Sequence, residues 1–101
     1  MTQRAIFIVH RTQPGVRDRV QAVWQRHMQP AIAANPHHLA YHYGFDAVDP
    51  DVIRVFQLYS DPDAAAAFLR SAAYAAYLAE VEPLLMGPPE VAAADEVWAK
   101  G

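Results

Sequence analysis

The chain has 101 residues, no cysteine and a formal net charge of −3 at pH 7. With 53% hydrophobic and 19% charged residues, the composition is typical of a packed globule, and we expect a single domain over residues 1–101. The lack of cysteine excludes a disulfide scaffold, thiolate catalysis and cysteine-ligated zinc, and it fits a reducing, cytoplasmic location. The acidic balance argues against a nucleic-acid partner, and the apolar stretches are shorter than the ~20 residues of a membrane span.

The first two elements are predicted to be a strand and a long helix. Residues 4–12 (RAIFIVHRT) are β-branched and aromatic, which predicts a strand buried on both faces. Apolar side chains then follow one helix face at Val16, Val20, Val23, Trp24, His27, Met28 and Ala31. Pro30 predicts a kink or an end of this helix near Gln29, and Asn35-Pro36 ends it.

Residues 39–60 are predicted to form a β-hairpin, followed by helical sequence and a last strand. LAYHYGFD alternates, so that one face holds Leu39, Tyr41, Tyr43 and Phe45. VIRVFQLYS is its partner strand, across a turn at Asp49-Pro50-Asp51. Asp61-Pro62 marks a helix start, a second helical stretch spans Tyr74 to Val81, and EVAAADEVWAK is a weakly alternating strand.

This order, β-α-β-β-α-β, predicts an α+β ferredoxin-like fold with a four-stranded antiparallel sheet and both helices on one face. Both faces of the sheet are apolar. One would carry Ile6, Ile8, Ile53 and Val55, and the other Phe7, Val9, Phe56 and Leu58. Because two helices cover only one face, the second face would leave an exposed apolar patch. We therefore expect a homodimer joined through the sheet face.

The five histidines invite a metal interpretation, which the strand spacing disfavours. In a strand, His38 and His42 lie about 13 Å apart, too far for one ion with Zn–N near 2 Å. We expect no metal site. His27 lies on the apolar helix stripe beside Trp24, as either a hydrogen-bonded core histidine or a polar group facing a pocket, where burial would suit proton transfer. His10, at the end of the first strand, has the same two interpretations.

Aromatic side chains are frequent, and most would simply pack in the core. Buried tyrosine hydroxyls need partners, however, so a pocket that holds a flat aromatic ligand is the functional alternative. The chain has no carboxylate pair suited to acid–base work, and it lacks the phosphate-loop, dinucleotide, nucleophile-elbow and zinc-protease motifs.

The order of strand, Pro-Gly, long helix, hairpin and strand-Asp-Pro-helix resembles the antibiotic biosynthesis monooxygenase (ABM) domain, a dimeric ferredoxin-like α+β barrel. The resemblance covers nearly the whole chain, and its sharpest part is VFQLYSDPDAAAAFLRSAAYAAYLAEV. There Ser71, Tyr74 and Tyr77 match the family's small cap residue and two ring positions. The resemblance therefore implies the same fold and dimer.

The chain also departs from the family's pattern at four positions. Gln57 stands where the family commonly has Glu, and Tyr59 where it has Trp. Phe68 and Ala73 stand where the family has two helix histidines. These departures count against the haem-degrading relatives, which need an axial His on this helix and an Asn on the first strand.

The resemblance implies oxidation of an aromatic polycyclic or quinol-type substrate by O2 without metal or flavin. A base removes a phenolic proton, and the substrate carbanion reduces O2. We predict His27 as this base. The predicted substrate-binding residues are Trp24, Gln57, Tyr59, Phe68, Tyr74 and Tyr77. The alternatives are a non-catalytic dimeric barrel that binds a small hydrophobic ligand, and a cyclase- or isomerase-like barrel enzyme acting on polyketide-like substrates.

Overall fold

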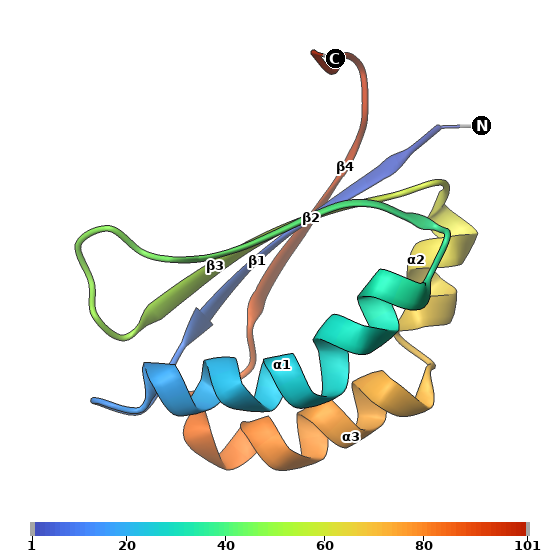
Figure 1. The fold of residues 1–101 in the computed structure, drawn as a ribbon. Helices are drawn as coiled ribbons and strands as arrows, with labels where there is room; N and C mark the ends of the chain where they lie inside the picture. The colour runs from blue at the N-terminus through green and yellow to red at the C-terminus, as the bar shows by residue number, and fades with distance from the viewer. Residues whose placement is uncertain (1, 101) are drawn as a thin grey trace.

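The structure, a computed structural model, describes residues 2–100 and confirms the ferredoxin-like α+β order (Figure 1). One antiparallel sheet has the strand order β2-β3-β1-β4. Its strands are β1 (Arg4–Arg11), β2 (His38–Phe45), β3 (Val52–Tyr59) and β4 (Glu90–Asp95). The helices are α1 (Arg17–Ala34), α2 (Pro62–Phe68), α3 (Ala72–Val81) and the short 3-10 turn η1 (Glu82–Leu84). The helices lie together on one side of the sheet (Figure 1).

The register between β1 and β3 confirms the two predicted sets of apolar side chains. Ile8 is paired with Val55, and Phe7 is paired with Phe56. Since successive side chains of a strand alternate between faces, the Ile8–Val55 row faces the helices and the Phe7–Phe56 row faces away from them. The pattern in the sequence therefore predicts the two faces of β1 and β3 correctly.

Helix α1 runs through Pro30 and ends at Ala34, so the predicted end near Gln29 is wrong. The predicted kink is present, because the ribbon changes direction in the last turns of α1 (Figure 1). Pro30 has no backbone N–H to donate, and its ring displaces the carbonyl of the residue four positions earlier. Proline thus bends this helix instead of terminating it.

The helical sequence after β3 forms two helices, each with its own side-chain cap. Asp61 caps α2, where its Oδ1 accepts the backbone N–H of Ala64 at 2.8 Å. Ser71 caps α3, where its Oγ accepts the backbone N–H of Tyr74 at 3.2 Å. The two caps allow the chain to change direction between α2 and α3, which brings both helices against the sheet.

A β-bulge near the start of β2 corrects the predicted alternation of that strand. The pairing with β3 shifts between His38 and Ala40, so that His38 lies opposite Tyr59. Leu39, predicted to share a face with Tyr41, is instead 47% exposed. A bulge adds one residue to one strand and re-aims the side chains beside it. Here it turns the His38 ring toward the helices.

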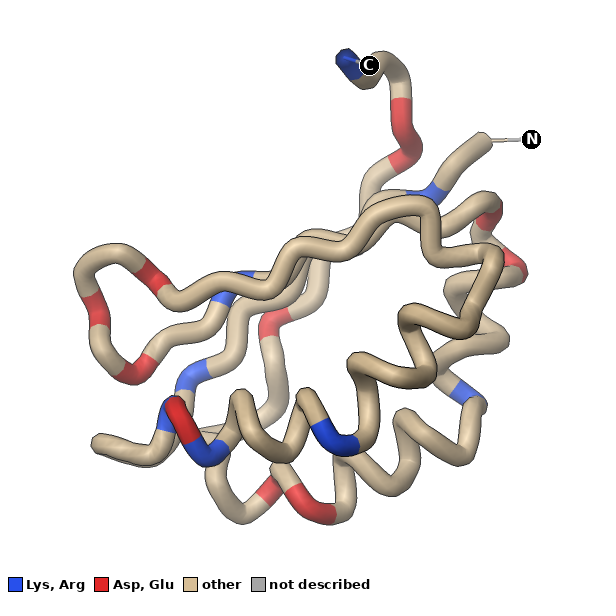
Figure 2. The backbone as a smooth tube through the Cα atoms, viewed as in Figure 1, with Lys and Arg blue, Asp and Glu red and all other residues tan. Residues whose placement is uncertain are grey.

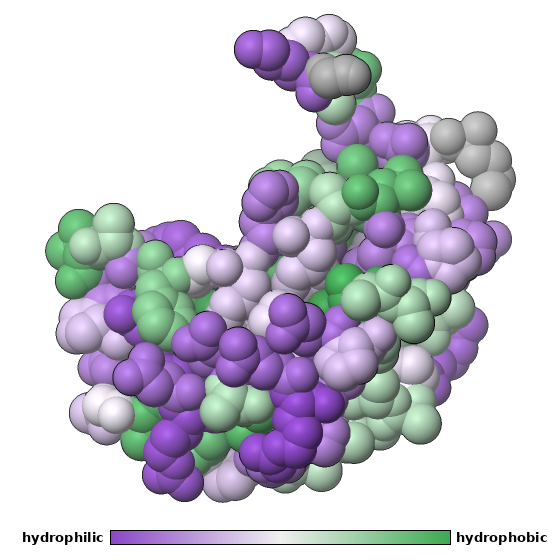
Figure 3. Space-filling view, viewed as in Figure 1, coloured by the Kyte–Doolittle hydropathy of each residue, from purple (hydrophilic) through white to green (hydrophobic). Residues whose placement is uncertain are grey.

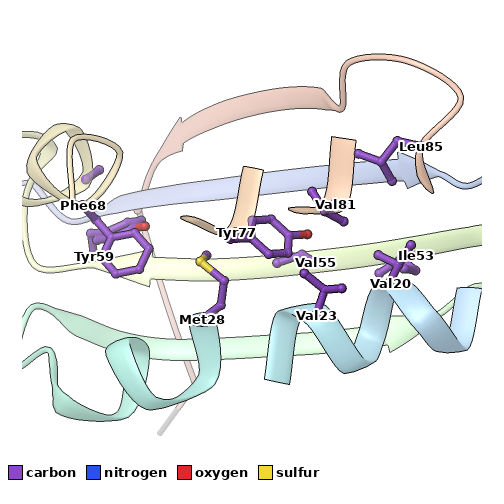
Figure 4. Close-up of a cluster of buried hydrophobic side chains, with 11 residues drawn as sticks. Val20, Val23, Met28, Ile53, Val55, Tyr59, Phe68, Tyr77, Val81 and Leu85 are labelled. Atoms are coloured by element: carbon purple, nitrogen blue, oxygen red, sulfur yellow. The ribbon is translucent and has the colours of Figure 1, made fainter. Parts of the chain in front are cut away.

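The core lies between the sheet and the helices, and its largest fully buried side chains are Tyr59, Ile53, Val20 and Val81 (Figure 4). Acidic residues gather in the turn between β2 and β3, and Lys and Arg residues are spread along the described backbone (Figure 2). In that turn Asp46 accepts the backbone N–H of Asp49 at 2.8 Å and pairs with Arg54. These contacts lower the pKa of Asp46 to about 2.

The segment after β4 stands away from the body in the space-filling view (Figure 3). Its Val97 and Trp98 are strongly exposed. Among residues 2–100, none of the helices combines the length and the apolar character that crossing a membrane requires.

The Asp61 cap gives a first prediction. Replacing Asp61 with Ala removes the side-chain acceptor at the start of α2, and loss of an N-cap typically costs about 1 kcal/mol. The free energy of unfolding, measured by urea denaturation, should fall by about this amount. Asp63→Ala is the matched control, because Asp63 lies in the first turn of the same helix but caps nothing. Equal losses in the two variants would contradict the assigned cap.

Candidate functional site

A cavity of about 120 Å³ lies between the sheet and the helices. Ile6, Ile8 and Val55 form its floor on the sheet. Aromatic rings form much of the remaining lining: Trp24, Tyr41, Tyr43, Tyr59, Phe68, Tyr74 and Tyr77. Two other lining residues, Leu69 and Val91, are more than half exposed, so the cavity meets solvent near the end of α2 and β4.

The structure brings together the six residues that the sequence predicts as substrate-binding. All of them line the cavity: Trp24 of α1, Gln57 and Tyr59 of β3, Phe68 of α2, and Tyr74 and Tyr77 of α3. In the close-up, Tyr59, Phe68 and Tyr77 lie in the same space between the strands and the helices, with Met28 of α1 among them (Figure 4). Their contact with a substrate stays a prediction.

On the side of β2, the cavity wall is a cluster of three rings, Trp24, Tyr41 and Tyr43. The Trp24 ring stacks on Tyr43 at a centroid distance of 4.2 Å, and its Nε1–H donates to the Tyr41 hydroxyl at 3.2 Å. The hydroxyl of Tyr43 is buried and has no partner among the described residues. Burial raises the pKa of Tyr41 to about 12 and raises that of Tyr43 as well. Both phenols therefore stay neutral at neutral pH.

Gln57 is held by a chain of hydrogen bonds whose direction follows from one backbone group. The backbone N–H of His37 donates to Asn35 Oδ1 at 3.1 Å. Asn35 Nδ2 must therefore donate to His38 Nδ1, at 2.9 Å. His38 then carries its proton on Nε2 and donates it to Gln57 Oε1 at 3.2 Å. The Tyr59 hydroxyl donates to the same oxygen at 2.6 Å.

This series of hydrogen bonds uses the oxygen of Gln57 and leaves its amide nitrogen, Nε2, available to a group in the cavity. Its oxygen already accepts two hydrogen bonds, whereas Nε2 has no acceptor within residues 2–100. Gln57 is buried and lines the cavity, so its N–H groups are fixed donors for a ligand oxygen. Burial lowers the pKa of His38, which agrees with the neutral ring that this chain requires. Sequence reasoning missed His38, because only the bulge turns its ring inward.

His10 is a second histidine that the structure places at the cavity. It is only 6% exposed and lines the cavity. Its Nδ1 is buried without a hydrogen-bond partner among the described residues. Burial lowers the pKa of His10 to about 4, so the ring is neutral at neutral pH. The alternation of Ile6, Ile8 and His10 in β1 is the sequence signal for this position.

His27, the predicted base, lies away from the cavity and is not part of its lining. Its Nε2–H donates to Glu80 Oε1 at 2.8 Å, and Arg26 donates to the same carboxylate at 2.7 Å. These contacts join α1 to α3 and lower the pKa of Glu80. The apolar stripe of α1 contacts two different surfaces: Trp24 and Met28 face the cavity, whereas His27 faces α3. The expectation that His27 faces a pocket is therefore wrong, and its role as a base stays an untested prediction.

The lining carries no Asp, Glu, Lys or Arg among the residues that the structure describes. Within the same residues, no group of three or more His, Cys, Asp or Glu side chains is placed to hold a metal ion. The site can thus hold a flat ring by apolar contact and direct it with hydrogen bonds from neutral groups.

A ferredoxin-like sheet with helices on one face places the chain in the class of α+β proteins, here with a ring-lined cavity between the sheet and the helices. The sequence model of the family described as antibiotic biosynthesis monooxygenase matches residues 5–80. The chain therefore belongs to the ABM family. A comparison with curated proteins finds none that matches.

Solved structures share the fold at low sequence identity. A proposed antibiotic biosynthesis monooxygenase from Chloroflexus aurantiacus is 23% identical, with a TM-score of 0.83 over 98% of this chain and 97% of that one. Another, from Caulobacter crescentus, is 21% identical, with a TM-score of 0.89 over 96% and 92%. A protein of unknown function from Nitrosomonas europaea is 24% identical, with a TM-score of 0.83 over 99% and 94%.

The burial of His10 predicts that stability depends on pH. The pKa of His10 is about 4 in the folded chain, against ~6.5 when unfolded. Between these values the unfolded state binds more protons, so the free energy of unfolding falls as pH is lowered from 6.5 to 4. The full effect of His10 is about 3 kcal/mol.

Urea denaturation at several pH values in this window measures the effect. His10→Leu should flatten the pH dependence, leaving the contribution of His38 and, near pH 4, those of Glu80 and Asp46, which have the same sign. His42→Gln is the control, because His42 is exposed on the outer sheet face. An unchanged pH dependence in His10→Leu would show that His10 is not buried as the structure has it.

Proposed function

We propose that the chain is a monooxygenase that oxidises a quinol-type aromatic substrate with O2. The proposal rests on one observation: in a chain of the ABM family, a ring-lined cavity presents the fixed amide donors of Gln57. Membership of the ABM family supports the oxygenase chemistry. The resemblance to this family implies that the reaction needs neither metal nor flavin. The cavity supplies the place where an aromatic ring would bind.

The cavity volume favours a small substrate over a polycyclic one. Its volume of about 120 Å³ is near that of the engineered cavity of ~150 Å³ that binds benzene in another protein. The cavity therefore holds one aromatic ring as it stands. A polycyclic substrate would exceed this volume and would extend past Leu69 and Val91 into solvent. We accordingly favour a one-ring quinol within the broader class of aromatic polycyclic and quinol-type substrates.

The reaction balances without any further reductant. A quinol loses a proton from one hydroxyl, and its anion transfers electrons to O2. A C–O bond forms on the ring, the O–O bond breaks, and the second oxygen leaves as water, so that quinol and O2 give hydroxyquinone and water. The apolar floor would admit O2, and the Gln57 N–H groups would stabilise the negative charge that develops on a substrate oxygen.

A second candidate function is non-catalytic binding of a small aromatic ligand. The observation that favours it is the neutrality of the site. Burial raises the pKa of the cavity tyrosines and lowers that of His10 and His38. Within residues 2–100, the lining holds no carboxylate. Such a site binds a ring well but offers no strong base at neutral pH. O2 uptake separates the two functions.

The functional test fills the cavity from α2. Ala65 is buried and lines the cavity, so Ala65→Leu should occupy the ligand's space. Oxygen uptake with a panel of hydroquinones and anthrones should be present in the wild type and should fall at least tenfold in Ala65→Leu, because substrate and added side chain compete for one volume. An oxygen electrode measures the rate.

Ala66→Leu is the matched control, because Ala66 is exposed on the same helix. It should keep wild-type uptake. Equal uptake in Ala65→Leu would place the reaction outside this cavity. Wild-type protein that binds these aromatics by calorimetry but consumes no O2 with any of them would be a binding protein, and the oxygenase proposal would fail.

We further propose that the chain is a homodimer joined through the outer sheet face. Phe7 is 47% exposed there and packs on Phe56 at a ring-centroid distance of 5.3 Å. Val9 and Leu58 on the same face are only partly buried. A partner subunit would remove this apolar surface from water, which is the main favourable contribution to such an interface.

The dimer is tested by its mass in solution. Sedimentation at micromolar concentration should give about twice 11.2 kDa for the wild type. Phe7→Lys should shift the protein toward the monomer, since it places a charge in the proposed interface. Val48→Lys is the control, because Val48 is 91% exposed in the turn between β2 and β3. A monomeric wild type would refute the proposal.

A further inference from the structure

His10 is a cavity residue that the proposed function does not yet use. It is the second-last residue of β1, and its pairing with Ile53 places it on the sheet face toward the helices. The chain after η1 passes this end of β1, where the backbone N–H of Met86 donates to the carbonyl of Arg11 at 2.8 Å. The imidazole is therefore enclosed at this end of the cavity.

The two ring nitrogens of His10 have different surroundings. Nδ1 is sealed by protein atoms and has no partner among the described residues. Nε2 is not sealed in this way and also has no partner within residues 2–100, so it is the nitrogen that can meet a ligand in the cavity. A proton on the sealed Nδ1 could reach neither water nor a ligand and would leave a buried donor unsatisfied, whereas a proton on Nε2 keeps access to an acceptor in the cavity. The proton of the neutral ring thus belongs on Nε2.

His10 and Gln57 then present donors at opposite ends of the cavity floor. Gln57 is paired with Ile6, and His10 follows Ile6 by four residues on the neighbouring strand. Strand geometry separates their Cα atoms by about 14 Å. A single ring with an oxygen at each end, plus hydrogen bonds of about 2.8 Å on both sides, is shorter than this Cα separation, so it can lie along the floor between the two positions. Between the two donors, the floor of Ile8 and Val55 is apolar.

We infer that His10 is a ligand-binding residue that donates a hydrogen bond from Nε2 to an oxygen at the end of the cavity opposite Gln57. The pair selects a one-ring ligand with an acceptor oxygen at each end. This inference rests on the cavity being the binding site in the proposed function. It goes beyond that function because it assigns a second donor. Since the oxygens of a quinone and of a quinol can both accept a hydrogen bond, two donors hold either form of the ligand.

The first test reads the tautomer directly. In wild-type protein labelled with ¹⁵N, long-range proton–nitrogen correlation spectra distinguish a protonated imidazole nitrogen from an unprotonated one. The inference expects His10 to be protonated on Nε2 and not on Nδ1 at neutral pH. A proton on Nδ1 would overturn it, since Nε2 would then be an acceptor.

The second test compares two ligands in three proteins. Cyclohexane-1,4-dione has an acceptor at each end of one ring, and cyclohexanone has one acceptor only. Removing the donor in His10→Leu should weaken binding of the dione about three- to tenfold, with binding of the ketone nearly unchanged because Gln57 still serves it. His10→Gln keeps an N–H donor at similar reach and should restore dione binding. The ratio of the two affinities, from NMR titration, is compared between the three proteins, because the solvation of each free ligand is the same in every case and cancels in that comparison.

Each outcome separates this inference from the oxygenase proposal. An equal loss for both ligands in His10→Leu would mean that His10 only packs, which overturns the inference alone. Failure of both ligands to bind the wild type would overturn it together with the cavity as a binding site. The expected ratios in a protein that consumes no O2 with any quinol would support the inference and refute the oxygenase.

Discussion

The antiparallel pairing of β1 with β3 decides which side chains reach the cavity. Its register places Ile6 beside Gln57 and Ile8 beside Val55, with His10 two positions further along β1. Because side chains alternate along a strand, a slip of one residue between β1 and β3 would turn one strand over relative to the other, so that Gln57 and His10 would face opposite sides of the sheet. The helices then pack over the sheet face that carries these side chains. The floor of the site is therefore set by strand pairing before any helix contributes a ring.

Burial makes the site neutral, and hydrogen bonds then carry its specificity. The same loss of water that lowers the pKa of His10 raises that of Tyr77. Among the residues that the structure describes, the lining holds no Asp, Glu, Lys or Arg, so a ligand bound there would meet only apolar surface and fixed dipoles. Negative charge that develops on a bound quinol would be stabilised by oriented N–H groups, which need little reorganisation during the reaction.

Two of the departures from the family pattern act together in this chain. Gln57 replaces the common Glu and Tyr59 the common Trp, and the Tyr59 hydroxyl donates to the Gln57 oxygen at 2.6 Å. A carboxylate at position 57 could only accept hydrogen bonds. The amide instead turns its N–H groups toward the cavity. The substitution therefore changes what the site offers a ligand from an acceptor to a donor.

The sequence by itself determined the order of elements, the two apolar faces of the sheet and six of the rings and polar groups that line the cavity. These follow from local periodicity and from turn residues such as Asp61 and Pro62, whose effects act over a few neighbours. Only the tertiary structure decided which histidines face the cavity. The apolar stripe of α1 is wide enough to contact both the sheet and α3. His27 lies on the side toward α3, where it contacts Glu80. The bulge that turns His38 inward depends on pairing with a strand fourteen or more residues away, and such long-range pairing leaves no local signal.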